Sequence, residues 1–172
     1  MLLNYLKGFL VKNKVKNSLL AERTVPNSNK IKTVGLLIDE NYFSEKIDLI
    51  SQIVSNGILK EDIQVLVYKN RGNKNKECEY PVFTPKNLNW NAEINNKNVE
   101  DFINKEFDLL ISYYDVEKAL LLLVTHHSKA DFKVGFSSID KRLNDLMISI
   151  NAENHKVFIH ELFRYLKILN KI

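Results

Sequence analysis

The chain has 172 residues, a net charge of +4 at neutral pH and a hydrophobic content of 45%. These values are typical of one globular domain with a real core, and the scarcity of glycine and proline argues against long disordered tracts. A single cysteine, Cys78, excludes an intramolecular disulfide and fits a reducing compartment. No apolar run approaches the roughly 20 residues of a membrane-spanning helix, and no cleavable signal peptide is evident. We therefore expect a cytoplasmic protein.

The positive charge is concentrated at the N-terminal end of the chain. The segment 1–32 contains seven lysines and arginines against one acidic side chain, whereas the segment 33–172 contains 18 basic and 20 acidic ones. Residues 2–22 have the periodicity of an amphipathic helix, with Lys7 and Lys14 opposite a broad apolar face. Residues 23–30 read as a linker. Such a helix either packs on its own domain or binds a membrane surface, a nucleic acid or another protein.

Strands and helices alternate from residue 31 onward. The nearly continuous apolar run 31–39 predicts a strand that is covered on both faces, and 45–56 predicts a helix with Ser44 as its N-cap. Gly57 fits the left-handed position that ends such a helix, and a second strand is predicted over 62–68. The predicted buried stripe of the helix contains Ile47, Ile50, Ile53 and Val54, with Leu49 beside it. This strand–helix–strand order begins a doubly wound sheet.

The following part of the chain is more polar. Residues 69–79 predict a basic surface loop, and a short strand over 80–84 is expected at a sheet edge or strand end because of Pro81. A short helix is predicted over 99–106, with Asn98 as its cap.

The segment 107–136 is the most informative part of the sequence. It predicts a buried strand over 107–113, a buried helix over 116–128 capped by Asp115, and a second strand over 132–136. A βαβ unit of this kind belongs to a parallel sheet covered by helices.

A last strand over 146–150 and a last helix over 155–170 complete the pattern. The predicted core face of this helix contains Val157, Phe158, Leu162, Tyr165, Leu166 and Leu169. The predicted fold class is therefore α/β, with one Rossmann-like three-layer domain over 31–172 and a mostly parallel sheet. A basic amphipathic N-terminal helix and linker over 1–30 precede it.

Ligands of doubly wound sheets bind beyond the carboxyl ends of the strands. Phosphate-binding folds place glycines in the first turn there, so that backbone amides can reach the phosphate. Here the turn over 39–44 reads DENYFS, with two carboxylates and no glycine, and carboxylates repel phosphate. Asp39 and Glu40 are either an acid–base pair or the polar start of a helix. We predict no catalytic residue and no cofactor.

The histidines predict no metal site. His126 and His127 are adjacent on a helix, so their side chains point about 100° apart, and we expect them to interact with the helix dipole. His155 and His160 lie at i and i+5, which is not the i, i+4 spacing of zinc-binding helices. Cys78 has no histidine near it in the sequence, as a catalytic thiol would require.

The segment 107–136 resembles part of the N-terminal half of the heptosyltransferase-type glycosyltransferases. The matching residues are the strand 107–111, the leucine-rich helix 116–124 and the KVGF sequence at 133–136, and the first strand TVGLLID also fits. The glycine–aspartate turn of that family is missing after the first strand. The C-terminal half that holds the nucleotide-sugar is missing too, so no catalytic residue is carried over.

The whole chain is more closely similar to a family of short uncharacterised bacterial proteins that is typical of flavobacteria. The residues that carry this resemblance are FKVGF at 132–136, IDKRLNDLMI at 139–148 and LKILNKI at 166–172. The resemblance implies a fold and a host range, and it implies no chemistry.

Three functions are compatible with the sequence. The leading hypothesis is a non-catalytic binding or scaffold module that docks through its basic helix. The docking surface is a protein complex or an anionic surface, and peripheral contact with a membrane is included. The alternatives are a glycosyltransferase-like enzyme half that acts with a second chain, and an RNA- or ribosome-associated protein. The candidate partner-binding residues are Lys7, Lys12, Lys14, Lys16, Lys69 and Arg71.

Overall fold

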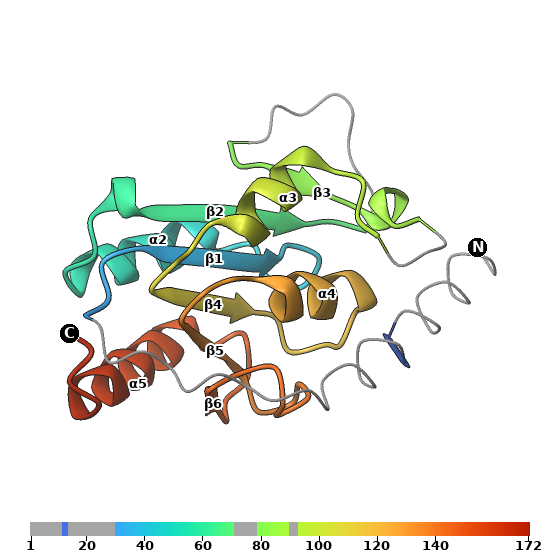
Figure 1. The fold of residues 1–172 in the computed structure, drawn as a ribbon. Helices are drawn as coiled ribbons and strands as arrows, with labels where there is room; N and C mark the ends of the chain where they lie inside the picture. Colours follow the sequence, from blue (N-terminus) through green and yellow to red (C-terminus); the bar gives the residue numbers. More distant parts are fainter. Residues whose placement is uncertain (1–11, 14–29, 71–78, 90–92) are drawn as a thin grey trace.

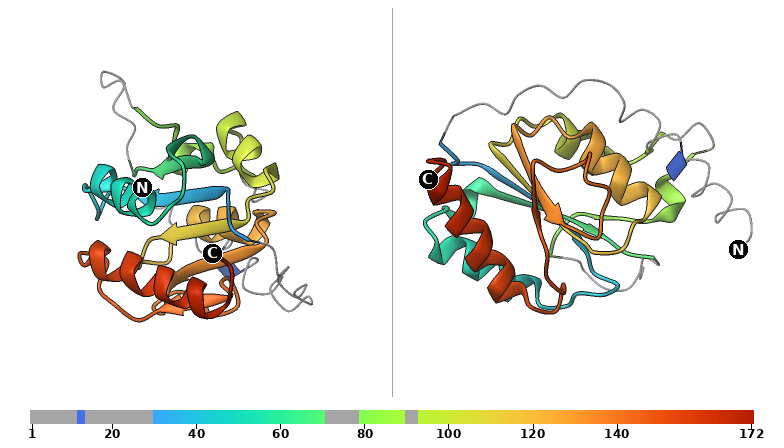
Figure 2. Two further views of the ribbon diagram at one scale, coloured as in Figure 1. Left: turned by 90° about the vertical axis from the view of Figure 1, so that its left-hand side faces the viewer. Right: turned by 90° about the horizontal axis from the view of Figure 1, so that it is seen from below.

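A six-stranded sheet lies between two pairs of helices in the computed structural model, which describes residues 12–13, 30–70, 79–89 and 93–172 (Figure 1). Figure 2 shows the three layers edge-on. One face is covered by α2 (Lys46–Ser55) and α5 (His155–Ile168). The other face is covered by α3 (Lys97–Asn104) and α4 (Ala119–His127). The predicted Rossmann-like three-layer class is confirmed.

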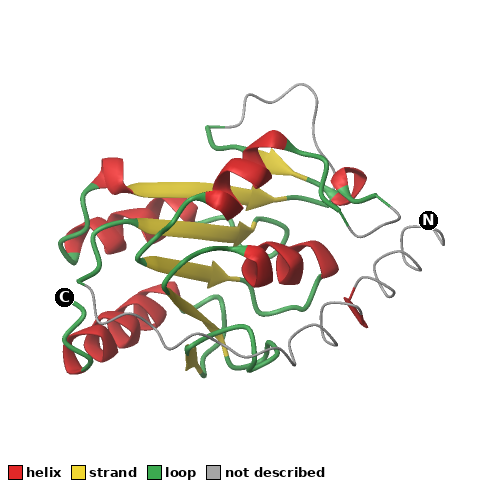
Figure 3. Ribbon diagram, in the orientation of Figure 1, coloured by secondary structure: helices red, strands yellow, loops and turns green. Residues whose placement is uncertain are grey.

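All six strands run parallel, and their order across the sheet is β3-β2-β1-β4-β5-β6 (Figure 3). Their bounds are β1 (Val34–Asp39), β2 (Ile63–Tyr68), β3 (Val82–Phe83), β4 (Leu109–Tyr113), β5 (Phe132–Phe136) and β6 (Leu146–Ile148). The register of the sheet places Leu36 of β1 beside Val65 of β2 and Ile111 of β4. The chain reverses its direction of travel across the sheet between β1 and β4, which makes this the switch point where such folds bind ligands.

The central strands are buried on both faces. Every residue of β1 and of β4 is buried, which explains why both sequences are apolar nearly throughout. On the α5 side, the ring of Tyr113 packs against Phe136 and Phe158, with ring centroids 5.1 Å apart in each pair. The Tyr113 hydroxyl donates a hydrogen bond to the carbonyl of Ala152, so this buried phenol has a polar partner.

Several helix starts differ from the predicted ones. The side chain of Asn96, not Asn98, accepts a hydrogen bond from the Val99 amide at 3.2 Å and caps α3. The helix α4 begins at Ala119, three residues later than predicted, because the preceding residues form a loop at the switch point. Gly57 has the predicted left-handed conformation, with φ +99°.

The buried face of α5 is rotated by about one residue from the predicted one. Ile159 and Phe163 are buried, whereas Val157 and Tyr165 are 49% and 36% exposed. On α2 the buried stripe is narrower than predicted, and Ile47 is 67% exposed. The two helices also pack against each other, so their apolar residues divide between the sheet, the neighbouring helix and solvent.

The predicted N-terminal helix and linker lie almost entirely outside the described residues. Lys12 and Asn13 are described, and both are helical. Within the described ranges, no helix combines the length and the apolar character needed to cross a membrane.

Gly35 lies in the middle of β1 under two aromatic side chains. A Cβ atom at this position would come within 2.8 Å of the Phe107 ring and 3.1 Å of the Phe102 ring. Glycine is therefore required here by the close approach of α3 and the segment that leads into β4.

Replacing Gly35 by alanine is expected to lower the free energy of unfolding by about 1–3 kcal/mol, because the core has no room for the methyl group. Shortening the ring neighbour with Phe107→Leu should make room, so the double variant should lose less than the sum of the two single variants. Urea unfolding followed by circular dichroism measures all three. Strict additivity would contradict the contact.

Candidate functional site

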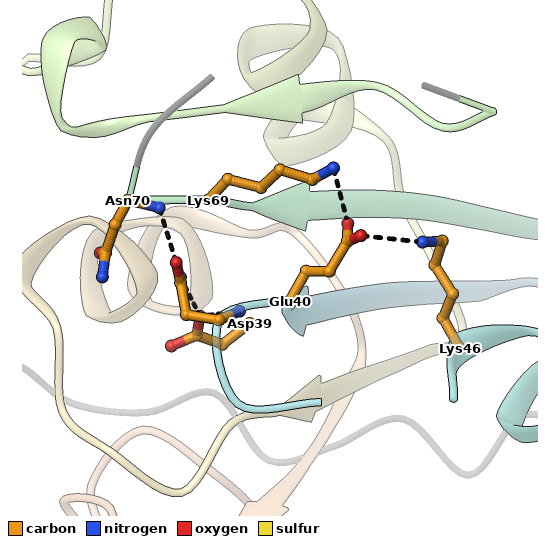
Figure 4. A network of polar contacts seen from close by, with 6 residues as sticks. Asp39, Glu40, Lys46, Lys69 and Asn70 are labelled. Atoms are coloured by element: carbon orange, nitrogen blue, oxygen red, sulfur yellow. Dashed lines mark hydrogen bonds and ion pairs between the residues drawn. The ribbon is translucent and has the colours of Figure 1, made fainter. Parts of the chain in front are cut away.

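The carboxyl ends of β1 and β2 carry a network of polar side chains at the switch point (Figure 4). The network contains Asp39, Glu40, Asn41, Lys46, Lys69 and Asn70. Parallel strands end at the same edge of a sheet, which is why residues from both loops meet here.

Three consecutive backbone amides of the first turn already have acceptors within the chain. The Glu40 amide donates to the Tyr68 carbonyl at 3.1 Å, and the Asn41 amide donates to Asp39 Oδ1 at 3.1 Å. The Tyr42 amide donates to the Asp39 carbonyl at 3.4 Å. A phosphate-binding turn leaves such amides for its ligand, so these three amides are occupied within the chain where such a turn would present donors.

Asn41 fastens the turn to the end of β2. Its side-chain amide donates to Asp39 Oδ1, and its Oδ1 accepts a hydrogen bond from the Asn70 amide at 2.9 Å. This Asx-type arrangement joins the end of β1 to the end of β2 through hydrogen bonds of Asn41.

A buried ion pair crosses the switch point. Lys118 Nζ lies 2.5 Å from Asp39 Oδ2, and the two side chains are only 15% and 3% exposed. The ammonium also lies 4.6 Å from the ring centroid of Tyr42 and 4.9 Å from that of Tyr68. The contact is that of an ion pair flanked by aromatic faces and not of an aligned hydrogen bond. It compensates the charge of a carboxylate that would otherwise be costly to bury.

Glu40 is held by two lysines. Its Oε1 lies 3.1 Å from Lys46 Nζ and its Oε2 lies 3.1 Å from Lys69 Nζ. Burial acts to raise the pKa of Glu40, but hydrogen bonding and attraction by Lys69 and Lys46 together outweigh it, and the pKa is lowered. Together with Lys118, which pairs with Asp39, three lysines compensate the charges of the two carboxylates of the turn. The repulsion of phosphate that we expected from the carboxylates is therefore offset, and the constraint lies in the occupied amides instead.

Tyr68 does not serve as a base at neutral pH. Burial raises the pKa of Tyr68 to about 12, with smaller contributions from Asp39 and Tyr42. The protonated hydroxyl donates to Asn70 Oδ1 at 3.2 Å, so Tyr68 is a neutral member of the network.

His126 and His127 lie in the last turn of α4, and their predicted interaction with the helix dipole stays a prediction. Burial, followed by the nearby charge of Lys133, lowers the pKa of His127, and burial, His127 and Lys133 lower the pKa of His126. The ammonium of Lys133 donates to the carbonyls of Thr125 at 2.8 Å and His126 at 3.3 Å. A lysine from β5 thus stabilises this helix end.

His155 joins α2 to α5. Its Nε2 lies 2.5 Å from Asp48 Oδ2, and its Nδ1 lies 3.1 Å from Glu45 Oε2. The two ring nitrogens face different carboxylates, so the three side chains do not converge on one point. In the part of the chain that the structure describes, no group of three or more histidine, cysteine or acidic side chains is arranged to hold a metal ion.

Two of the six predicted partner-binding residues are described, and both form ion pairs within the chain. Lys12 Nζ lies 2.6 Å from Glu117 Oε2, and Lys69 binds Glu40. The other four lie outside the described residues: Lys7, Lys14, Lys16 and Arg71. Their role in partner binding stays a prediction.

Sequence reasoning missed Lys118, which completes the site. The signal for it is indirect, because a buried strand that ends in an aspartate requires a cation. Lys118 is the basic residue of the loop between β4 and α4, and that loop ends at the same edge as Asp39.

The strand order and the three layers define this chain as a Rossmann-like α/β protein with an ion pair and hydrogen bonds between its own residues at the switch point. Residues 7–169 match the model of a family of unknown function, DUF6913, and the chain belongs to this family. This agrees with the resemblance to an uncharacterised family, whereas the resemblance to heptosyltransferases is not shown. Neither a curated protein nor a solved structure shows a significant match to the chain.

Removing either partner of the switch-point ion pair should leave an uncompensated buried charge. We expect Asp39→Asn and Lys118→Met each to lower the free energy of unfolding by about 3 kcal/mol, and the double variant to recover much of that loss. Denaturant unfolding of the four proteins gives the coupling. If the two losses simply added, the ion pair would not be what holds the switch point.

The lowered pKa of Glu40 predicts a loss of stability in acid. A carboxylate with a lowered folded-state pKa contributes stability above its ordinary pKa of 4.5, and this contribution disappears as the pH falls through the lower value. Between pH 7 and pH 3, the melting temperature of Glu40→Gln should therefore fall less than that of the unaltered protein. Glu153→Gln, at an exposed position, is the matched control and should follow the unaltered protein. Parallel curves for all three would refute the assignment.

Proposed function

We propose that this protein is a non-catalytic binding or scaffold module that docks on a larger protein assembly. The observation that carries the proposal is the set of contacts that the chain makes with itself at the switch point. The amides of Glu40, Asn41 and Tyr42 donate within the chain, where a nucleotide-binding turn would present donors to its ligand. An acid–base mechanism would need a titratable side chain such as Asp39 to be available to a substrate, whereas Asp39 is paired with Lys118.

The docking element of this proposal is the basic N-terminal segment. Its range 1–32 carries an excess of six positive charges, while the range 33–172 carries an excess of two negative charges. A segment of this kind favours a partner with an acidic surface. We place the protein in the bacterial cytoplasm, which accords with its single cysteine.

One observation favours a second candidate, a glycosyltransferase-like half that acts with another chain. The strand order β3-β2-β1-β4-β5-β6 is the order found in dinucleotide-binding sheets. Fold alone does not establish activity, and the turn chemistry argues against this candidate. RNA binding is a third candidate, and it predicts an affinity that falls steeply with salt.

The docking proposal predicts that N-terminal charge determines which proteins are recovered with this one. Affinity purification from the native host with mass spectrometry should recover a reproducible set of partners. The triple variant Lys7→Gln, Lys14→Gln and Lys16→Gln should lose this set, because neutralisation removes the attraction to an acidic surface. The control variant carries the same charge change at exposed positions of the folded domain, Lys60→Gln, Lys86→Gln and Lys97→Gln, and should keep it.

Recovery of the same partners with both triple variants would end the docking proposal. The enzyme candidate has its own readout in the same protein. A bound nucleotide-sugar would raise the melting temperature by ligand linkage, whereas the docking proposal predicts no shift with ADP- or UDP-sugars.

A further inference from the structure

We propose that Glu117 holds Lys12 at the carboxyl edge of the sheet, so that a partner of the basic N-terminal segment has to compete with Glu117 for this lysine. The inference rests on the proposed docking function and adds a regulatory contact to it. The competing partner is an acidic protein surface, because the group to be replaced is itself a side-chain carboxylate.

The geometry of the contact supports an intramolecular latch. Lys12 Nζ lies 2.6 Å from Glu117 Oε2, and the side chains are 34% and 17% exposed. The other carboxylate oxygen of Glu117 accepts a hydrogen bond from the Asp140 amide at 3.1 Å. This second bond fixes the orientation of the carboxylate, and a fixed acceptor loses less entropy when it binds an ammonium.

The loop that carries Glu117 is itself held in place. The carbonyl of Asp115 accepts a hydrogen bond from the Ser138 hydroxyl at 2.8 Å, which ties the loop to the connection between β5 and β6. The adjacent Lys118 anchors the same loop to Asp39. Glu117 is thus presented from a fixed backbone at the carboxyl edge of the sheet.

The neighbouring acidic side chain, Asp140, forms an ion pair with Arg142. Arg142 Nη2 lies 2.7 Å from Asp140 Oδ2, and Arg142 Nε donates to Asp140 Oδ1 at 2.9 Å. Among the described residues, Glu117 contacts Lys12. A partly exposed ion pair of this kind changes an equilibrium by up to about fivefold, and salt weakens it. A partner with several carboxylates is therefore able to displace it.

Cleavage by trypsin after Lys12 tests this contact directly, because the protease has to bind the free lysine side chain. In the full chain, Glu117→Gln should increase the rate of cleavage between Lys12 and Asn13 by about two- to fivefold at low ionic strength, by the fold-change expected for such a pair. The difference should shrink in high salt. Glu153→Gln makes the same charge change at an exposed position and should leave the rate unchanged. Equal rates in Glu117→Gln and the unaltered protein would overturn the latch.

Binding to a defined acidic probe provides the second arm. Glu117→Gln should bind a poly-glutamate peptide up to about fivefold more tightly than the unaltered protein. A gain confined to phosphatidylserine vesicles would overturn the choice of an acidic protein as competitor. Faster cleavage together with unchanged partner recovery in the N-terminal triple variant would retain the latch and remove the docking function. Unchanged cleavage together with lost recovery would do the reverse.

Discussion

A buried carboxylate at the end of the central strand determines how the carboxyl edge of the sheet is built. Asp39 is 2% exposed, and a charge in that position requires a cation in contact with it. The cation comes from Lys118, which follows β4 on the other side of the switch point. The ion pair therefore spans the two strands between which a Rossmann-like fold opens its ligand crevice. It also explains why α4 starts only at Ala119, because the residue before it is extended and directs its side chain back to β1.

The contacts at the switch point differ from the arrangement of free donors that a phosphate-binding turn presents. The order of strands fixes where a ligand would bind, but the donors and charges at that place determine whether it does. Here the amides of the first turn have acceptors in Asp39 and in the Tyr68 carbonyl, and Asn41 fastens the turn to β2. Glu40 is likewise bound on both carboxylate oxygens. The edge is stabilised as part of the fold.

The apolar patterning of the sequence predicts the sheet well. Strands that are covered on both faces need continuous apolar runs, so β1, β4 and β5 are recognisable from sequence, and the βαβ pattern implies their parallel direction. The partner of Asp39 is not predictable in this way. It depends on which strand lies next to β1, and a periodic pattern contains no information on strand order. The rotated face of α5, on which Ile159 and Phe163 are buried, is not predictable from periodicity either, because α5 packs against α2 as well as against the sheet. Helical periodicity predicts that a face exists and leaves its centre uncertain by about one residue.

The loop between β4 and α4 presents opposite charges in two directions. Lys118 points towards the switch point and binds Asp39, while the preceding residue, Glu117, binds Lys12 of the basic segment. Because the two side chains leave the same short stretch of backbone, a displacement of that backbone alters both contacts. The hydrogen bonds from Ser138 and from the Asp140 amide oppose such a displacement. The interior ion pair thus has a second effect besides neutralising Asp39, since it fixes the backbone from which Glu117 contacts Lys12.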